Sequence, residues 1–415
     1  MMIEFMRIRL YHIIIASVYL ILANPRLSAA QVFTFEGNTT RQTISFKQVK
    51  NLVVIPVIIN GQGPYNFLLD TGVGQMIITD TALLKYVDVS QHKPVQIQGY
   101  GIGEGISAYM TRNITAKVGK ATISAIPTAI FKDDLFDLSG YLGLKIHGVL
   151  GYYFFNSFVV RINYKSNRLT FYTPGSKFKY KGRPYPMRIV KAKPYILATV
   201  QTGENETDSV RLLVDNGSSH PLLLESLHKG IFPLPDKHIP ANLGVGINGV
   251  INGVMGRINS LRIGNDNFKD VLTGFPEFNP KRTEMEGIDR NGTLGAEILR
   301  HYLVTFDYNN NKIYLKPSER LNTKFDHDMS GIEIYTVSDV NTVFYVGRIE
   351  PGSPADIAGI QTNDQLLSVD LKSVNAYTLS DLAELLKSSD GKQVLIEIDR
   401  NKQRLIFLIR LKRRI

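Results

Sequence analysis

The 415-residue sequence contains no cysteine, and this absence excludes several kinds of chemistry. Without a thiol the chain has no disulfide, no cysteine nucleophile, no zinc–thiolate site and no lipid attached at cysteine. The eight histidines show no close ligand pairing, so we expect no metal and no cofactor. The net charge of +11 is spread along the chain, and only residues 412–414 cluster. We therefore expect no nucleic-acid partner.

Long apolar runs are also scarce, and none outside the N-terminus is long enough to cross a membrane. Residues 1–30 combine a basic start at Arg7 and Arg9, an apolar stretch over 10–23 and small residues at 28–30. This pattern predicts a secretory signal peptide and an exported protein, periplasmic or extracellular. If the segment is not cleaved, it would anchor the protein to a membrane.

A strand that ends in an acidic residue occurs twice in the chain. In residues 67–72 an apolar run leads into Asp70, and in residues 212–217 a similar run leads into Asp215. A carboxylate at the end of a buried strand is costly unless it accepts hydrogen bonds. In both copies a glycine follows two residues later, which lets the chain fold back so that backbone amides can reach the acid.

Each acid is followed, at nearly the same separation, by a second shared motif. Residues 148–151 read Gly-Val-Leu-Gly and residues 292–295 read Gly-Thr-Leu-Gly, and each precedes an apolar strand, at 158–164 and 302–308. Two motifs in the same order at nearly one spacing predict an internal repeat. The frequent short apolar runs favour sheets, so we expect a mainly β protein.

The doubled acid and Gly-x-Leu-Gly motifs resemble the pepsin-like and retropepsin-like aspartic proteases. The resemblance implies a bilobal β fold with a pseudo-twofold repeat, with lobes at 31–180 and 181–322. It implies that Asp70 and Asp215 face each other, share one proton and activate a water that hydrolyses a peptide or protein substrate. It also implies five supporting residues, namely Thr71, Gly72, Asn216, Gly217 and Ser218.

Asn216 departs from the family pattern, which expects a Thr or Ser whose hydroxyl bonds to the opposite loop. The alternative to an endopeptidase is therefore a catalytically impaired, protease-like protein that binds peptides and works through the C-terminal domain described below. We expect Ser218 to donate to Asp215, whereas its counterpart Val73 cannot donate, so a raised carboxylate pKa and a near-neutral pH optimum are predicted. Ser218 and Ser219 beside His220 lack a strand–elbow–helix context, so a serine hydrolase is not expected.

Two glycine-rich segments, residues 96–110 and 243–250, occupy matching places in the repeats. No helix pattern follows the first, which excludes a dinucleotide loop. The family resemblance implies flaps over a cleft, and the alternative is a plain glycine-rich hairpin. The flap candidates are Tyr100, Gly101, Gly103, Gly246 and Gly249. We also expect helices at 80–86 and 222–228.

The character of the chain changes after residue 317. Residues 351–369, with a helix at 379–386 and two alternating strands after it, resemble a PDZ domain of exported bacterial proteases, expected at 323–415. The resemblance implies that a peptide C-terminus adds a strand to the domain edge while loop amides hold its carboxylate. By position, these contacts fall on Gly331, Ile332, Glu333 and Ile334. The ligand could be substrate, a partner or the chain's own tail at 411–415.

Overall fold

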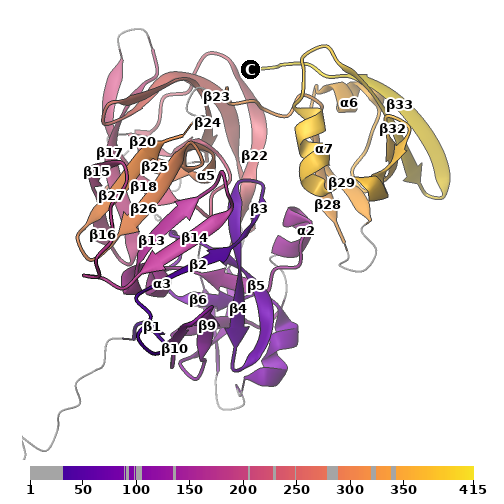
Figure 1. The fold of residues 1–415 in the computed structure, drawn as a ribbon. Helices are drawn as coiled ribbons and strands as arrows, with labels where there is room; N and C mark the ends of the chain where they lie inside the picture. Colours follow the sequence, from indigo (N-terminus) through magenta and orange to yellow (C-terminus); the bar gives the residue numbers. More distant parts are fainter. Residues whose placement is uncertain are drawn as a thin grey trace, which may run out of the picture. The chain divides into compact units, whose positions relative to one another are not determined.

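The chain folds mainly into β-strands, as Figure 1 shows for the computed structural model, which confirms the expected fold class. The structure describes residues 31–415 except 88, 90–92, 98, 100–104, 134–136, 204–205, 228–229, 248, 278–287, 319–323 and 338–342. The expected signal peptide at 1–30 lies outside the described residues. Within the described part, no helix is both long and apolar enough to span a membrane.

The first repeat forms a sheet of eleven described strands. In spatial order they are β1 (Thr34–Phe35), β10 (Ala121–Ile123), β9 (Ala116–Val118), β4 (Leu52–Ile59), β5 (Gln62–Leu69), β12 (Gly148–Leu150), β6 (Met76–Ile78), β11 (Thr128–Phe131), β8 (Ile106–Thr111) and β7 (Pro94–Ile97), with β3 (Lys47–Val49) on β4. The helix expected at 80–86 is the 3-10 helix η1 (Thr81–Tyr86), capped by the Asp80 side chain. Two short helices follow, α2 (Leu138–Leu142) and α3 (Tyr152–Ser157).

The second repeat forms a sheet of eight described strands. In spatial order they are β16 (Arg188–Val190), β17 (Lys193–Gln201), β18 (Thr207–Asp215), β25 (Gly292–Gly295), β19 (Leu222–Leu224), β24 (Asp266–Pro276), β23 (Gly249–Ile263) and β22 (His238–Gly246). The helix expected at 222–228 is wrong. Residues Leu222–Leu224 are a buried strand between β24 and β25, and β20 (Ser226–Leu227) then pairs with β21 (Gly230–Ile231). The short helix α5 (Ala296–Leu299) follows β25.

The pairing of the acid-bearing strand with the Gly-x-Leu-Gly strand matches residue for residue in the two repeats, which confirms the internal repeat. In the first, β12 runs parallel to β5, with Gly148 opposite Phe67, three residues before Asp70. In the second, β25 runs parallel to β18, with Gly292 opposite Leu212, three residues before Asp215. In each repeat, the strand that leads to the acid therefore pairs in parallel with the strand of the Gly-x-Leu-Gly motif.

A six-stranded sheet joins the two repeats. Its order is β15 (Arg183–Pro186), β27 (Lys312–Pro317), β26 (Tyr302–Asp307), β13 (Val159–Asn163), β14 (Arg168–Tyr172) and β2 (Arg41–Ser45). At its centre the equivalent strands β13 and β26 pair antiparallel, with Val160 opposite Phe306. The two repeats thus share one hydrophobic core, to which Phe155, Phe171 and Phe306 contribute fully buried rings.

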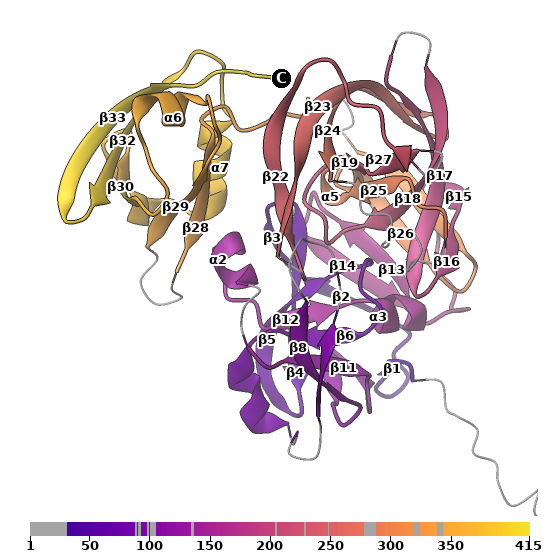
Figure 2. The same ribbon diagram turned by 180° about the vertical axis from the view of Figure 1, so that it is seen from behind.

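The C-terminal module, residues 324–415, has its own sheet and core (Figure 2). The sheet order is β28 (Ile332–Thr336), β29 (Phe344–Ile349), β30 (Gln365–Val369), β32 (Gln393–Arg400) and β33 (Gln403–Arg410), with β31 (Lys372–Ser373) on β30. Ser353 caps the helix α6 (Pro354–Ala358), η2 (Val374–Ala376) follows β31, and Thr378 begins α7 (Leu379–Leu386) with a capping box. The expected helix at 379–386 is confirmed. The expected boundary at 322 and 323 lies outside the described residues.

Candidate active site

Asp70 and Asp215 lie at equivalent places, each at the C-terminal end of a central strand. The Gly72 amide donates a 2.6 Å hydrogen bond to Asp70 Oδ1, and the Gly217 amide donates a 2.9 Å bond to Asp215 Oδ1. The turn that each glycine permits therefore supplies the carboxylate with a backbone donor. Both acids line the same cavity.

The two acidic loops pack against each other so closely that only glycine fits at the contact. A Cβ atom added to Gly217 would lie 2.2 Å from Asp70 Cγ, and one added to Gly72 would lie 2.9 Å from Asp215 Oδ2. Each carboxylate thus rests on the glycine of the opposite repeat. The acids that sequence reasoning paired are brought together across the axis of the repeat.

Asn216 links the two loops in place of the expected hydroxyl residue. Its Oδ1 accepts hydrogen bonds from the Thr71 amide at 2.8 Å and the Thr71 hydroxyl at 2.9 Å. Its Nδ2 donates to the Leu69 carbonyl at 2.7 Å, and its amide donates to Thr71 Oγ1 at 3.1 Å. The Thr71 hydroxyl also lies 2.7 Å from the Val214 carbonyl. Since Thr71 and Asn216 are fully buried, these bonds tie the loops together out of contact with water.

The surroundings of Asp70 favour its protonated form. Burial is the largest cause that raises the pKa of Asp70 well above its ordinary value, and the charge of Asp215 is the next. A hydrogen bond with Asp215 raises the pKa further, whereas the Gly72 amide and the charge of Lys193 lower it. Two carboxyl groups in contact resist ionising together, because their like charges repel.

The cavity above the acids has a volume of about 1680 Å³ and is lined by both repeats. Its walls are largely apolar and include Leu138 and Tyr141 of α2 from the first repeat and Leu243 and Val250 of the β22–β23 hairpin from the second. Arg112, on the first-repeat side, adds positive charge. A cavity of this size and lining can hold several residues of an extended peptide.

The expected flap residues divide between described and undescribed positions. Tyr100, Gly101 and Gly103 lie outside the described residues, although the strands of their hairpin, β7 and β8, are observed. Gly246 and Gly249 face each other at the end of the β22–β23 hairpin, and Gly246 lines the cavity. The described strands on either side of the first segment therefore pair antiparallel, and those of the second segment, β22 and β23, pair antiparallel at the cavity wall.

Ser218 does not play the part expected of it. Within the described residues its hydroxyl makes no hydrogen bond to the Asp215 carboxylate, whose donor is the Gly217 amide. Ser218 contributes its backbone instead, since its amide bonds the Asp215 carbonyl and its carbonyl accepts from the Ala296 amide. The turn after Asp215 therefore brings the chain back to the end of the Gly-x-Leu-Gly motif. The sequence around Asp215 does not reveal this contact.

Two features of the site were missed by sequence reasoning. The wall helix α2 has only five residues and no periodic pattern that would predict it. His220, treated above only as a triad fragment, lines the cavity, and burial lowers its pKa to about 4. Within the described part of the chain, no group of three or more His, Asp or Glu side chains is placed to hold a metal ion.

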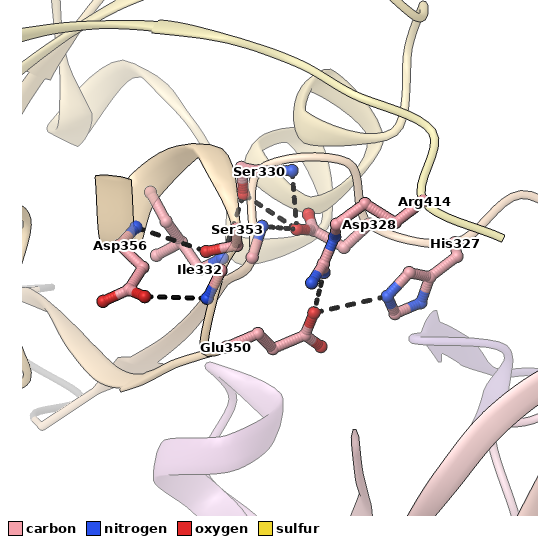
Figure 3. A network of polar contacts seen from close by, with 10 residues as sticks. His327, Asp328, Ser330, Ile332, Glu350, Ser353, Asp356 and Arg414 are labelled. Atoms are coloured by element: carbon pink, nitrogen blue, oxygen red, sulfur yellow. Dashed lines mark hydrogen bonds and ion pairs between the residues drawn. The ribbon is translucent and has the colours of Figure 1, made fainter. Parts of the chain in front are cut away.

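The residues predicted to bind a peptide C-terminus lie at the start of β28. The Gly331 amide donates to Asp328 Oδ1 at 2.6 Å, and the Ile332 amide donates to Ser330 Oγ at 3.0 Å (Figure 3). The Glu333 carboxylate bonds Asn242 of β22, and Ile334 faces the core of the module. Glu333 therefore points toward the second repeat.

The tail at 411–415 does not occupy this position. Leu411 packs into the core of the module, whereas Ile415 packs into the core shared by the two repeats. Arg414 forms an ion pair with Glu350, as Figure 3 shows. The tail thus runs along the residues that connect the repeats to the module.

Two protein families match parts of the chain. The aspartyl protease family matches residues 55–154, which contain Asp70, and the PDZ domain family matches residues 345–400. No curated protein is significantly similar to the chain.

Solved structures with the same kinds of domain are similar to the chain at low identity. The aspartic proteinase from Irpex lacteus is 14% identical, with 68% of this chain and 99% of that chain covered and a TM-score of 0.43. A retropepsin-like aspartic protease from Rickettsia conorii is 20% identical, with 34% of this chain and 93% of that chain covered and a TM-score of 0.25. The HtrA3 PDZ domain, solved with the phage-derived ligand FGRWV, is 26% identical, with 19% of this chain and 80% of that chain covered and a TM-score of 0.17. From the family matches and the repeat, the chain is an aspartyl protease-like protein with a C-terminal PDZ domain.

Proposed function

We propose that this protein is an aspartic endopeptidase that hydrolyses peptide bonds with a water activated by Asp70 and Asp215. The observation that carries the proposal is the contact of each acidic loop with the carboxylate of the other, at the floor of a cavity lined by both repeats. The hydrogen bonds of Asn216 support it further, because they supply the link between loops that the missing hydroxyl would have made.

The proposed reaction needs one proton shared between the acids. The raised pKa of Asp70 favours Asp70 as the protonated member and Asp215 as the charged one. Asp215 takes a proton from water while the water oxygen bonds to the peptide carbonyl carbon, and Asp70 gives its proton to the carbonyl oxygen. The resulting diol collapses when the amide nitrogen takes a proton from Asp215 and the carbon–nitrogen bond breaks. In the same step one diol hydroxyl becomes the new carbonyl and returns its proton to Asp70, which restores the starting state.

The sequence of residues 1–30 supports export of the protein, and we propose a periplasmic or extracellular location. The substrate is a peptide or an unfolded segment held extended between the cavity walls. The alternative is a peptide-binding protein that has lost cleavage.

The test is cleavage of a mixed peptide library by the full chain, read by mass spectrometry. We expect cleavage by the wild type and by Asn216→Thr, and none by Asp70→Asn. Asp208→Asn is the control, because Asp208 lies on the same strand as Asp215 but at its other end. A wild type that binds library peptides without cleaving them would instead establish the peptide-binding alternative.

A further inference from the structure

The strand β28 is an edge strand of the PDZ sheet in the part of the chain that the structure describes, since it pairs there with β29 alone. The Val337 amide donates to the Val343 carbonyl, so residue 337 faces β29. Backbone groups alternate between the two sides of a strand, and the carbonyl of Thr336 therefore faces the free edge. A free edge of this kind is where an added peptide strand would bond.

The helix α2 of the protease domain lies against this free edge. The Thr336 hydroxyl donates to the Gly140 carbonyl at 3.4 Å, and a Cβ atom added to Gly140 would lie 2.7 Å from the Thr336 carbonyl oxygen. The rings of Tyr141 and Tyr335 lie 5.9 Å apart. The backbone of α2 thus fills the space that the backbone of an added strand would need.

Gly143, which ends α2, closes the space between β28 and α7. A Cβ atom added to Gly143 would lie 2.9 Å from Leu379 Cβ and 3.5 Å from Thr336 Cγ2. Leu379 is the first residue of α7 and Thr336 is the last residue of β28. The left-handed backbone of Gly143, with φ at 63°, lets the chain turn at this contact.

The loop that is expected to hold a peptide carboxylate already binds a carboxylate of the chain itself. Asp328 Oδ1 accepts hydrogen bonds from the Ser330 amide at 2.9 Å, the Gly331 amide at 2.6 Å and the Ser330 hydroxyl at 2.8 Å. Figure 3 shows Asp328 inside this loop. A peptide carboxylate would have to displace a carboxylate that is covalently part of the loop.

A side chain of β28 also contacts β22, whose hairpin lines the same cavity. Glu333 Oε1 and Oε2 accept hydrogen bonds from Asn242 Nδ2 at 3.1 and 3.0 Å, and the Tyr335 hydroxyl donates to Glu333 Oε1 at 3.0 Å. Asn242 lies in β22, whose hairpin also lines the cavity. One strand of the PDZ domain therefore contacts two elements that line the candidate active site, α2 and β22.

We propose that the peptide-binding face of this PDZ domain is an internal docking surface whose ligand is the segment Asp137–Gly143 of the same chain. The domain holds α2, and with it Leu138 and Tyr141 of the cavity wall, in place of a free peptide C-terminus. The proposal rests on contacts between the domains and does not depend on whether the cavity cleaves peptides.

The first test uses a disulfide between α2 and α7. Because the chain has no cysteine, Gly143→Cys with Leu379→Cys introduces the only thiols. Their Cβ atoms would start 2.9 Å apart, so the two elements must separate by about 1 Å to reach the spacing of about 3.8 Å found in disulfides. The matched control pairs Gly143→Cys with Ile357→Cys, at an exposed position on α6. We expect the first pair to oxidise at least about tenfold faster in the full chain, because its effective concentration is set by docking. Equal rates for the two pairs would overturn the proposal.

The second test uses only the wild-type chain, so its result does not depend on whether a variant folds. Fluorescein-labelled short peptides that carry each common amino acid at a free carboxyl terminus are titrated onto the wild-type full chain, with amidated peptides as controls, and followed by polarisation. We expect no saturable binding that depends on the free carboxylate. Carboxylate-dependent binding in the micromolar range by any of the peptides would show an open face and refute α2 as its ligand.

Discussion

At the scale of single residues, the candidate site depends on hydrogen bonds that cross between the two repeats. Thr71 and Asn216 are fully buried, and each donates a hydrogen bond to the other. From the sequence the paired acids could be predicted, because the strand–acid–glycine pattern occurs twice. The effect of Asn216 could not, because it depends on whether its amide reaches the Leu69 carbonyl in the opposite loop.

Replacing Asn216 with Ala should destabilise the protein by about 2–4 kcal/mol, since it leaves buried groups of Thr71 and Leu69 without partners. Asn216→Thr should cost less, because its hydroxyl can still bond Thr71. Urea denaturation of the three proteins measures the difference. Equal stability of Asn216→Ala and wild type would mean that the link between loops contributes nothing.

His220 should make the protein sensitive to acid. Burial lowers the pKa of His220 to about 4 in the folded state, so between this value and the ordinary pKa of about 6.5 the unfolded chain binds the proton more tightly. Stability should therefore fall by about 3 kcal/mol as pH drops from 7 to 4. Denaturation measured across this pH range should show this fall in stability in His238→Asn, whose ring is exposed in the wild type, but not in His220→Asn. A slope that is the same in all three proteins would exclude His220 as its source.

The raised pKa of Asp70 should extend activity toward neutral pH. The sequence analysis attributed a raised carboxylate pKa to Val73, which cannot donate a hydrogen bond; in the structure the largest causes of the raised pKa of Asp70 are burial and the charge of Asp215. Because the reaction needs the shared proton, the fall in kcat/KM at high pH should lie above the range of an ordinary carboxyl group. Cleavage rates from pH 3 to 8 test this, and a profile that peaks well below about pH 4 would contradict it.

At the scale of elements, local patterns predicted strands well and their partners poorly. Residues Leu222–Leu224 are strand because β24 and β25 lie on either side, although the sequence alone suggests a helix. The pairing of β13 with β26 joins residues far apart in the chain, and the sequence of neither strand indicates its partner. The role of α2 likewise comes from its contact with β28, which five residues without periodicity do not encode.

The contact of α2 with the PDZ domain predicts different costs for alanine at two glycines. Gly37 and Gly143 both have φ at 63°, but an added Cβ meets nothing within 4 Å at Gly37 and lies 2.9 Å from Leu379 at Gly143. Gly37→Ala should cost about 1 kcal/mol from backbone strain alone, and Gly143→Ala about 1–3 kcal/mol more. Thermal or urea denaturation of both variants gives the comparison. Equal costs would show that α2 does not press against α7.

At the scale of the whole molecule, the fold places two copies of one half-site around a shared core and adds a PDZ domain to them. The aspartyl protease family matches only residues 55–154, so the assignment of Asp215 rests on the matched pairing of β18 with β25. This order of domains could be predicted from repeated and family-like motifs. The docking of the PDZ domain could not, because the contacts of Glu333 with Asn242 and of Thr336 with Gly140 form only in the folded chain.

The central claim is that Asp70 and Asp215 act as one catalytic unit. Its most direct test is kcat/KM on one library-derived peptide for Asp70→Asn, Asp215→Asn and the double variant. The account predicts that each single variant loses about 10³-fold or more and that the double variant loses no more than either single one. A variant at either acid that keeps wild-type kcat/KM, or losses in the single variants that multiply in the double variant, would contradict it.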